Sequence, residues 1–265
     1  MKKLDELIDW FSDKSRVIVA LSGGVDSALV AYAAFQQLGT SALAVTADYN
    51  TLSKDELFSA KKICSEIGIK QLFLQYDELE NKEFVRNDSN RCFHCRFELG
   101  THLINLATKH HVSTIVDGTH VDDLGDYRPG IEAIRQNGIQ SPLVDTNFTK
   151  SDIRETAKFV GLSIHEKPSN SCLASRIPWG QRVTAEKLAR IELGETIIKQ
   201  ITRIEQVRVR DFNFSAKIEV EKKMIGLFTD DILQLITKKL KMIGFTEVEL
   251  DKDGYKPGKI NVMVD

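Results

Sequence analysis

A short loop with two glycines, two serines and an aspartate stands near the start of the chain, at Ser22–Ser27, with the sequence SGGVDS. It lies between an apolar run and a segment with helical spacing, and the backbone N–H groups at the start of a helix attract anions. Gly23 and Gly24 permit a tight turn and the close approach of a phosphate, to which the serine hydroxyls can donate. Asp26 is suited to position Mg²⁺. These residue types predict a phosphate-binding loop.

The loop is not a Walker A motif, because no lysine follows it. The segment Gly254–Lys259 looks closer to that motif, but it has one residue too few, and Ile260 stands where Ser or Thr belongs. No helix is expected after it either. The alternative for Ser22–Ser27 is an ordinary turn beside a solvated aspartate.

Two of the four cysteines, Cys92 and Cys95, form a CxxC pair where a polar loop meets a predicted helix. The positive end of the helix and the neighbouring Arg91 and Arg96 favour thiolates there. The pair is compatible with a redox site, with half of a zinc site, or with two thiols that have no role. The thioredoxin-like context of a redox pair is absent, and tetrahedral zinc requires two more ligands.

The other two cysteines have contrasting surroundings. Cys172 stands in the polar segment Pro168–Arg176, which has no helical or strand period, so a chemical role is favoured over packing. Cys64 lies near isoleucines in a predicted helix and is interpreted as a packing residue. Three thiolates that leave one coordination position open suit an iron–sulfur cluster that binds an extra ligand.

Two arginines, Arg208 and Arg210, are two residues apart on a predicted strand and therefore point to one face of it. Two guanidinium groups side by side suit a phosphate monoester. The alternative is a solvated strand face with no ligand.

Strand-like and helix-like segments alternate over the first two-thirds of the chain and position these residues. The alternation predicts right-handed βαβ units and an α/β fold with a doubly wound, mostly parallel sheet, which binds ligands at the carboxyl ends of its strands. The expected strands are Arg16–Leu21, Ala42–Thr46, Lys70–Gln75 and Ser113–Val116. The expected helices are Asp5–Phe11, Val25–Leu38, Ser53–Ile67 with a capping box from Ser53 to Glu56, Cys95–His110 and Ser151–Val160.

The pattern changes after Lys167-Pro168 to a β-β-α-β order that is preceded by a helix, which predicts a small α+β domain. Its expected elements are the helices Thr184–Ile201 and Thr229–Met242 and the strands Val207–Arg210, Lys217–Val220 and Thr246–Leu250. We therefore expect a phosphate-loop domain over residues 1–170 and a substrate-binding or oligomerisation domain over residues 171–265.

The composition excludes disordered, fibrous and disulfide-dense classes, since 42% of residues are hydrophobic and 28% are charged. Lys and Arg number 36 against 38 Asp and Glu, so the net charge of −2 argues against a general nucleic-acid or membrane binder. The apolar run Val17–Leu21 is too short to span a bilayer, and the segment Met1–Trp10 does not have the apolar stretch expected of a signal peptide. The expected location is cytoplasmic, with reduced cysteines.

The loop Ser22–Ser27 resembles the SGGxDS loop of the N-type ATP pyrophosphatases, which have the adenine nucleotide alpha hydrolase-like (PP-loop) fold. Further segments make nearly the whole chain similar to the LarE family, ATP-dependent sulfur transferases that help to build the nickel-pincer nucleotide cofactor. These segments are Asp117–Asp123, Asp126–Gly130, Ser171–Arg176, Val207–Arg210 and Gly254–Tyr255.

The resemblance implies an enzyme that uses ATP and Mg²⁺ to adenylate a carboxylate of pyridinium-3,5-biscarboxylic acid mononucleotide, releases pyrophosphate and AMP, and forms a thiocarboxylate. In one branch of the family, a cysteine matching Cys172 donates its own sulfur and becomes dehydroalanine. In another branch, cysteines matching Cys92, Cys95 and Cys172 hold a [4Fe-4S] cluster with a detachable sulfide. This chain has all three cysteines and resembles the cluster branch, with Cys172 and Asp26 as its catalytic residues.

The same resemblance assigns the substrate phosphate to Ser175, Arg208 and Arg210. Glu195 and Glu219 match acidic positions nearby and are candidates for binding a divalent cation.

Two positions depart from the family pattern. His120 stands where many PP-loop enzymes have Asn, and Leu227 stands where an acidic residue is expected, which weakens the case for the cation site.

Two other functions remain open. A tRNA thiolation enzyme of the same superfamily would need a basic surface, which a net charge of −2 disfavours. A non-catalytic ATP-sensing module would release no pyrophosphate. The expected partners are a small mononucleotide, further copies of the chain in a homo-oligomer and other enzymes of the pathway, with no nucleic acid and no membrane.

Overall fold

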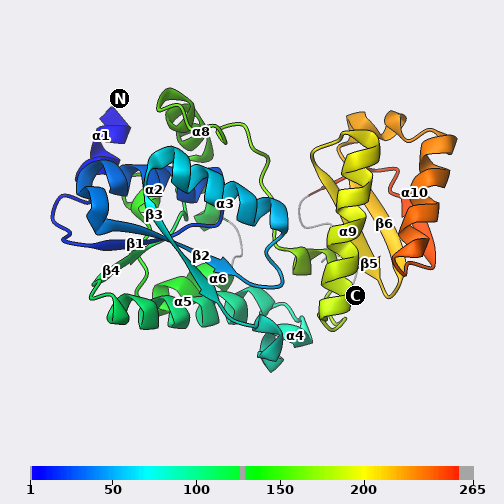
Figure 1. Ribbon diagram of the computed structural model, residues 1–265, viewed down its shortest axis with the longest axis horizontal. Helices are drawn as coiled ribbons and strands as arrows, with labels where there is room; N and C mark the ends of the chain where they lie inside the picture. Colours follow the sequence, from blue (N-terminus) through cyan, green and yellow to red (C-terminus); the bar gives the residue numbers. More distant parts are fainter. Residues whose placement is uncertain (1, 126–128, 257–265) are drawn as a thin grey trace. The chain divides into compact units, whose positions relative to one another are not determined.

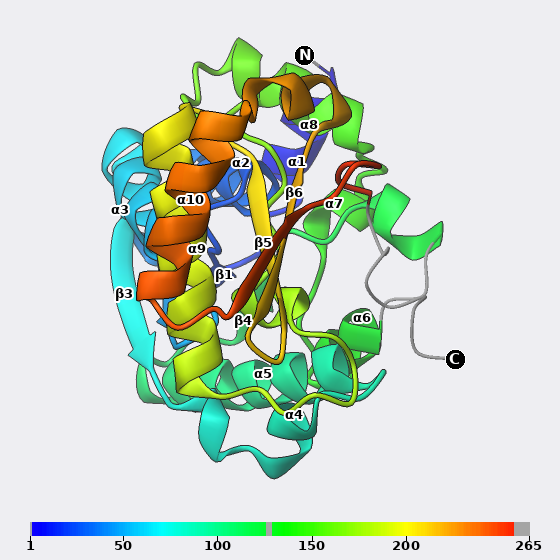
Figure 2. The ribbon, with the colours of Figure 1, turned by 90° about the vertical axis from the view of Figure 1, so that its right-hand side faces the viewer.

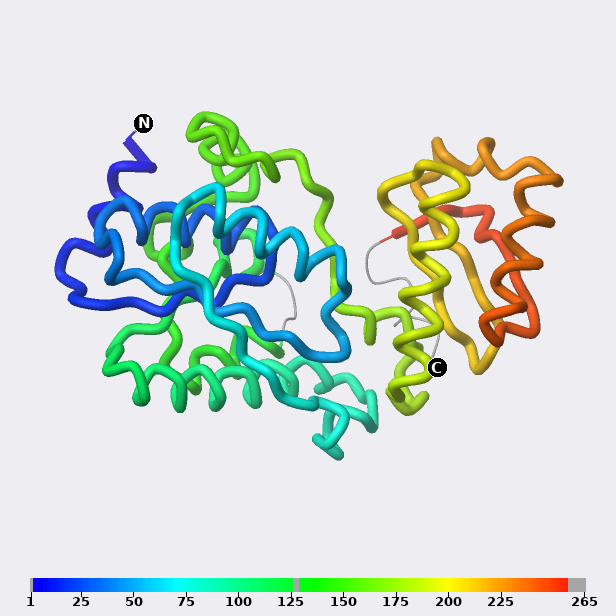
Figure 3. Tube along the Cα trace, viewed as in Figure 1, coloured from blue at the N-terminus to red at the C-terminus, as the bar shows by residue number. Residues whose placement is uncertain are grey.

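The computed structural model describes residues 2–125 and 129–256, and the chain divides into two compact units. The first unit comprises Met1–Glu78 and Asn90–Asn170, and the second comprises Leu79–Ser89 and Ser171–Asp265. The trace in Figure 3 follows the chain through both units. The second unit thus combines residues 79–89 with the chain from Ser171 onward, and the functional domains expected at residues 1–170 and 171–265 stay a prediction.

The first unit is built on a four-stranded parallel sheet with the strand order β3-β2-β1-β4. Val17 of β1 pairs with Ala42 of β2 on one side and with Thr114 of β4 on the other. The strands are β1 (Val17–Ala20), β2 (Ala42–Asp48), β3 (Lys70–Gln75) and β4 (Thr114–Val116). The order reverses between β1 and β4, and ligands of open parallel sheets bind at such a point.

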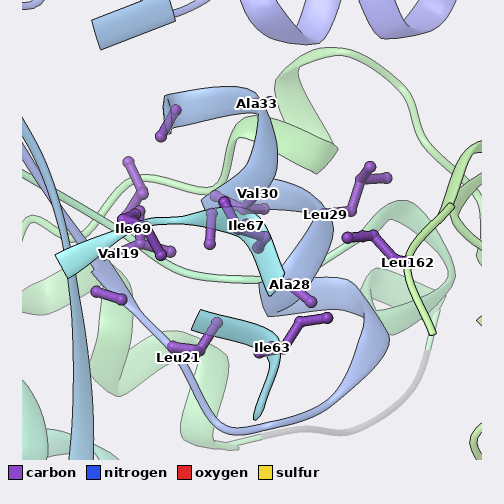
Figure 4. Close-up of a cluster of buried hydrophobic side chains, with 14 of the residues drawn as sticks. Val19, Leu21, Ala28, Leu29, Val30, Ala33, Ile63, Ile67, Ile69 and Leu162 are labelled. Atoms are coloured by element: carbon purple, nitrogen blue, oxygen red, sulfur yellow. The ribbon is translucent and has the colours of Figure 1, made fainter. Parts of the chain in front are cut away.

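Helices cover both faces of this sheet, as Figure 1 shows. Val17 and Val19 of β1 pack with α1, α2, α3 and α8 in one apolar core, part of which is drawn in Figure 4. Ile18, between them, packs with α5 and α6 in a second core. The helices are α1 (Lys2–Asp9), α2 (Val25–Leu38), α3 (Lys54–Ile67), α5 (Arg91–Lys109), α6 (Pro129–Gln136), α7 (Pro142–Asp145) and α8 (Lys150–Phe159). The expected doubly wound α/β fold is confirmed.

The second unit has a three-stranded sheet with the order β5-β6-β7, in which β6 is antiparallel to β5 and parallel to β7. Helices α9 and α10 pack beside this sheet (Figure 2) and share a core with it that includes Ile198, Val209 and Leu240. The elements are α4 (Lys82–Arg86), α9 (Ala185–Thr202), β5 (Val207–Phe212), β6 (Ser215–Val220), α10 (Asp230–Met242) and β7 (Glu247–Leu250).

Five short 3₁₀ helices complete the described chain: η1 (Gly39–Ser41), η2 (Glu78–Glu80), η3 (Val121–Gly125), η4 (Leu173–Arg176) and η5 (Lys222–Leu227). No helix in residues 2–125 or 129–256 is both long enough and apolar enough to cross a membrane.

Two local expectations were wrong. Helix α5 begins at Arg91 rather than at Cys95, so both cysteines of the CxxC pair lie in its first turn. The expected capping box of α3 is only half formed: Ser53 Oγ accepts the backbone N–H of Glu56, but the Glu56 carboxylate binds Lys167 and Asn170 instead.

Candidate functional site

The phosphate loop lies at the junction of β1 and α2, at the carboxyl end of the parallel sheet. Gly24 is the N-cap residue of α2, and no side chain caps the helix there. The Ser27 hydroxyl donates to the Gly24 carbonyl oxygen over 3.2 Å and accepts from the backbone N–H of Ser22 over 3.2 Å. An uncapped helix end offers N–H donors and the positive end of the dipole to an anion.

Gly23 has a backbone conformation and a packing environment that only glycine satisfies. Its φ is +84°, in the left-handed region. A Cβ atom there would lie 2.5 Å from the backbone carbonyl oxygen of Glu56 on α3. Any side chain would therefore push the loop away from α3.

A second loop, which follows β4, packs directly against the phosphate loop. A Cβ atom at Gly118 would lie 2.6 Å from the backbone nitrogen of Ser27. The preceding residue, Asp117, is buried and accepts hydrogen bonds from the hydroxyls of Thr119 (2.5 Å) and Ser141 (2.7 Å). The loops after β1 and β4 thus meet where the strand order reverses, which is the position expected of a ligand site.

Lys150, at the start of α8, forms the closest charge contact of this site. Its Nζ atom lies 2.5 Å and 2.7 Å from the two carboxylate oxygens of Asp26, and both side chains are 27% exposed. Its backbone N–H donates to Asp122 over 2.7 Å. Lys150 was not identified from the sequence as a site residue. A signal was present, because a cation in the first turn of a helix is unfavourable with the helix dipole and therefore suggests another role.

His120 is buried in the loop after β4. Its Nε2 atom lies 3.5 Å from Asp123 Oδ2, and its Nδ1 atom has no hydrogen-bond partner among the described residues. This departure from the family pattern thus lies in the same loop as Gly118, which packs against Ser27.

The CxxC pair lies on the first turn of α5, with Cys92 exposed and Cys95 half-buried. The side chain of Asn90, the N-cap residue of α5, makes no capping hydrogen bond to the helix. Residues three apart share one face of a helix, so the two thiols can bind one metal centre. Cys64, by contrast, is buried, and burial raises the pKa of its thiol to about 12.

Cys172 belongs to the second unit, where it is half-buried immediately before η4. Its carbonyl oxygen accepts a hydrogen bond from Arg176 over 3.0 Å. A cluster held by Cys92, Cys95 and Cys172 requires ligands from both units and remains a prediction. Within the described residues, no group of three or more His, Cys, Asp or Glu side chains forms a metal site.

The second unit gathers buried arginines on one face of β5. Arg208 and Arg210 are only 3% and 4% exposed, which excludes the solvated strand face. Arg210 donates to Glu219 over 2.8 Å and 2.9 Å and to the carbonyl oxygen of Ser175 over 2.8 Å. Burial and the nearby guanidinium of Arg176 lower the pKa of Arg208 to about 10.

Two further side chains contact this cluster, and neither was assigned a role from the sequence. Arg176 is fully buried and donates to Glu195 over 2.8 Å and 3.2 Å. The ring of Tyr255 lies 5.5 Å from the guanidinium carbon of Arg208 and 6.0 Å from that of Arg210. Arg176, Arg208 and Arg210 thus bring three guanidinium groups together, and guanidinium groups are strong hydrogen-bond donors to an anionic ligand.

The acidic residues expected to bind a divalent cation are engaged with arginines instead. Glu195 and Glu219 pair with Arg176 and Arg210, and Leu227 is 48% exposed. The cation at Glu195 and Glu219 stays a prediction that the arrangement does not favour. Residues 126–128 of the family-like segment Asp126–Gly130 lie outside the described residues.

Known proteins are similar to this chain both around the phosphate loop and over nearly its whole length. The family model of the queuosine biosynthesis protein QueC matches residues 16–89. An uncharacterized protein of Synechocystis, slr1717, is 38% identical over 98% of this chain and 97% of its own. The pyridinium-3,5-bisthiocarboxylic acid mononucleotide synthase of Lactiplantibacillus plantarum is 29% identical over 96% of this chain and 92% of its own.

The chain belongs to the LarE family. A more distant relative is the tRNA-specific 2-thiouridylase MnmA of Wolbachia pipientis, 28% identical over 59% of this chain and 52% of its own. The LarE-type relative matches 96% of this chain and therefore extends through the second unit, whereas MnmA matches 59% of it.

Proposed function

We propose that this LarE-family protein uses ATP to activate a carboxylate of pyridinium-3,5-biscarboxylic acid mononucleotide and replaces one of its oxygens with sulfur. The observation that carries the proposal is the uncapped start of α2 at Ser22–Ser27, in a chain that aligns with the synthase over 96% of its length. That loop fits the pyrophosphate end of ATP because it offers helix N–H donors and serine hydroxyls without a bulky side chain.

The chemistry begins with positioning and charge stabilisation. The triphosphate lies over the start of α2. A substrate carboxylate oxygen attacks the α-phosphorus, the bond to pyrophosphate breaks, and an acyl-adenylate forms. A sulfur nucleophile then attacks the activated carbonyl carbon, the bond to the adenylate oxygen breaks, and AMP leaves with that oxygen.

The pair of Asp26 and Lys150 supplies the charges for the first step. Mg²⁺, when bound, would neutralise phosphate charge, and the Asp26 carboxylate is the ligand that this site offers to it. Lys150 holds that carboxylate through both of its oxygens. When Asp26 turns to the cation, the Lys150 ammonium becomes available to a phosphate oxygen.

The second unit offers a site for the phosphate monoester of the mononucleotide. Arg208 and Arg210 are buried on one strand face, and the backbone of Ser175 is hydrogen-bonded to Arg210. Charge-assisted hydrogen bonds from buried guanidinium groups are among the strongest available to a phosphate. This cluster supports a mononucleotide as the second substrate.

We assign the sulfur supply to a [4Fe-4S] cluster on Cys92, Cys95 and Cys172, which would deliver a detachable sulfide. The two thiols on the first turn of α5 support this assignment as two ligands of one centre. The competing source is Cys172 itself, which would become dehydroalanine. Iron content of anaerobically purified protein and the mass of the Cys172 peptide after turnover separate the two: iron with an intact thiol supports the cluster, and loss of H₂S from Cys172 contradicts it.

The proposal is tested by incubating the protein with ATP, Mg²⁺ and the biscarboxylate mononucleotide while measuring AMP, pyrophosphate and the thiocarboxylate product. Equal amounts of AMP and pyrophosphate are expected, and Ser22→Ala and Asp26→Ala should abolish both without unfolding the protein. Arg208→Ala and Arg210→Ala should weaken substrate binding far more than ATP binding. If the Asp26→Ala variant turned over ATP at the normal rate, the loop assignment would be wrong.

A tRNA thiolation activity is the second candidate, because MnmA is similar to 59% of the chain. The net charge of −2 does not favour it. Tight binding of tRNA that weakens steeply with salt would support this candidate over the mononucleotide.

A further inference from the structure

The carbonyl group of Gly23 is held from outside the phosphate loop by two side chains. Its oxygen accepts the hydroxyl of Ser59 on α3 over 3.1 Å and the Nζ atom of Lys167 over 2.9 Å. Both donors lie in the first unit, and Ser59 is buried. Two donors on one carbonyl oxygen fix the orientation of that peptide group.

Lys167 is in turn held by a carboxylate. Its Nζ atom lies 2.8 Å from Glu56 Oε2, and Asn170 Nδ2 donates to the other oxygen of Glu56 over 3.1 Å. The side chains of Lys167 and Glu56 are only 22% and 11% exposed. This contact explains why Glu56 does not complete the capping box of α3: its carboxylate orients Lys167 instead.

The orientation of this carbonyl determines where the next N–H group points. A trans peptide is planar, so its C=O and N–H bonds point in opposite directions. Because the Gly23 carbonyl is turned toward α3 and Lys167, the N–H of Gly24 is turned away from them. Gly24 is the N-cap residue of α2, so this N–H belongs to the end of the helix that binds the anion.

We infer that Lys167 is a positioning residue for ATP: with Glu56 and Ser59 it locks the Gly23–Gly24 peptide so that the Gly24 N–H faces the pyrophosphate part of the nucleotide. The inference rests on the proposed function, in which this loop binds ATP. The Lys167 ammonium group uses two of its three N–H donors on Gly23 and Glu56, so the role that we assign to it is to hold the loop. Without Lys167, the peptide keeps one of its two anchors and can rotate.

The test compares the Kd values of ATP and AMP for wild type, Lys167→Met, Lys167→Arg and Ser59→Ala, measured by calorimetry. Lys167→Met should raise the Kd of ATP by about tenfold, the effect of one lost charge-assisted hydrogen bond. The Kd of AMP should stay unchanged within error, because AMP lacks the pyrophosphate that the peptide faces. Lys167→Arg should recover most of the loss, since a guanidinium group can still donate to both oxygens.

Lys14→Met is the matched control. Lys14 is 21% exposed and pairs with Asp13 over 2.6 Å in the same unit, but it does not contact the phosphate loop. Its removal should leave both Kd values unchanged. An effect of Lys14→Met as large as that of Lys167→Met would show a general effect of losing a half-buried lysine and overturn the inference.

Two further outcomes separate this inference from the proposed function. Wild-type protein that binds no ATP contradicts both. If the wild-type protein binds ATP and the Lys167→Met variant binds it equally well, only the positioning role is overturned. The same holds if the variant loses affinity for ATP and for AMP to the same extent.

Discussion

At the scale of single residues, the surroundings of each cysteine decide its chemistry. Cys92 is exposed at the start of a helix, whereas Cys64 is buried among apolar side chains of α3 and its neighbours. Burial disfavours the thiolate, and the pKa of Cys64 rises to about 12. Only the thiolate is a nucleophile or a metal ligand, so Cys64 is separated from the proposed sulfur chemistry.

Alkylation with iodoacetamide at mildly alkaline pH tests this difference. In folded protein from which iron has been removed, Cys92 should be modified, whereas Cys64 should react only after denaturation, because its thiol stays protonated and inaccessible. Peptide mass spectrometry at successive times gives both rates. A native Cys64 that reacts as fast as Cys92 would contradict the assignment of Cys64 as a packing residue.

Lys150 provides the second prediction at this scale. The ion pair with Asp26 is about one-quarter exposed (27% for each side chain), so Lys150→Met should change the free energy of unfolding by no more than about 1 kcal/mol. Formation of AMP should fall by at least about tenfold, because a phosphate loses a charge-assisted donor. Urea denaturation and an AMP assay measure the two effects. Lost stability with normal turnover would mean that Lys150 serves the fold alone.

At the scale of elements, local patterns predicted the regular segments well and their long-range contacts poorly. Helix α2 has the expected bounds because apolar spacing and Gly39 define both ends. Helices α6 and α7 were missed, since each is short and begins at a proline in a polar segment. The Ser53–Glu56 pattern indicated a capping box, but Glu56 binds Lys167, 111 residues away, and no local rule reports such a partner.

The capping box that does form, at the start of α8, gives a prediction about pH. Asp152 accepts Lys3 Nζ over 2.6 Å and the backbone N–H of Thr149 over 2.9 Å, and these contacts lower the pKa of Asp152 to about 2. A carboxyl group with a lowered pKa stabilises the fold above its ordinary pKa of 3.8, and that contribution is lost as the pH falls toward about 2.

The variant Asp152→Asn should therefore reduce the free energy of unfolding by about 1 kcal/mol at neutral pH. Its difference from wild type should shrink as the pH falls through the range from 3.8 to about 2. Urea denaturation at a series of pH values measures the difference. A difference that stayed constant with pH would show that the carboxylate charge has no part in the cap.

At the scale of the whole molecule, the second unit recruits a segment that precedes it by about eighty residues in the chain. Asn87 is fully buried with a φ of 60°, and its side-chain amide donates to the carbonyl oxygens of Pro178 and Gln181 over 2.8 Å each. The backbone N–H of Val183 donates to Val85 over 3.0 Å. The sequence alone could not predict that residues 79–89 belong to the second unit, because the contacts that place them there join segments far apart in the chain.

The isosteric change Asn87→Asp tests this anchor. A carboxylate cannot donate to the two carbonyl groups, so the free energy of unfolding should fall by about 2 kcal/mol or more. Asn147 also has a positive φ, 54°, and is exposed, so Asn147→Asp is the control and should change little. Thermal unfolding compares the two variants. Equal melting temperatures would mean that the Asn87 amide does not anchor residues 79–89 to the second unit.

In the proposed mechanism, the substrate carboxylate is activated by adenylation before sulfur enters. Mass spectrometry of AMP formed from substrate with carboxylate groups labelled by a heavy isotope of oxygen tests this order, because the oxygen that attacks the α-phosphorus leaves with AMP. We expect one labelled oxygen in AMP for each thiocarboxylate formed, with unlabelled pyrophosphate. Unlabelled AMP, or ADP with the label in inorganic phosphate, would contradict it.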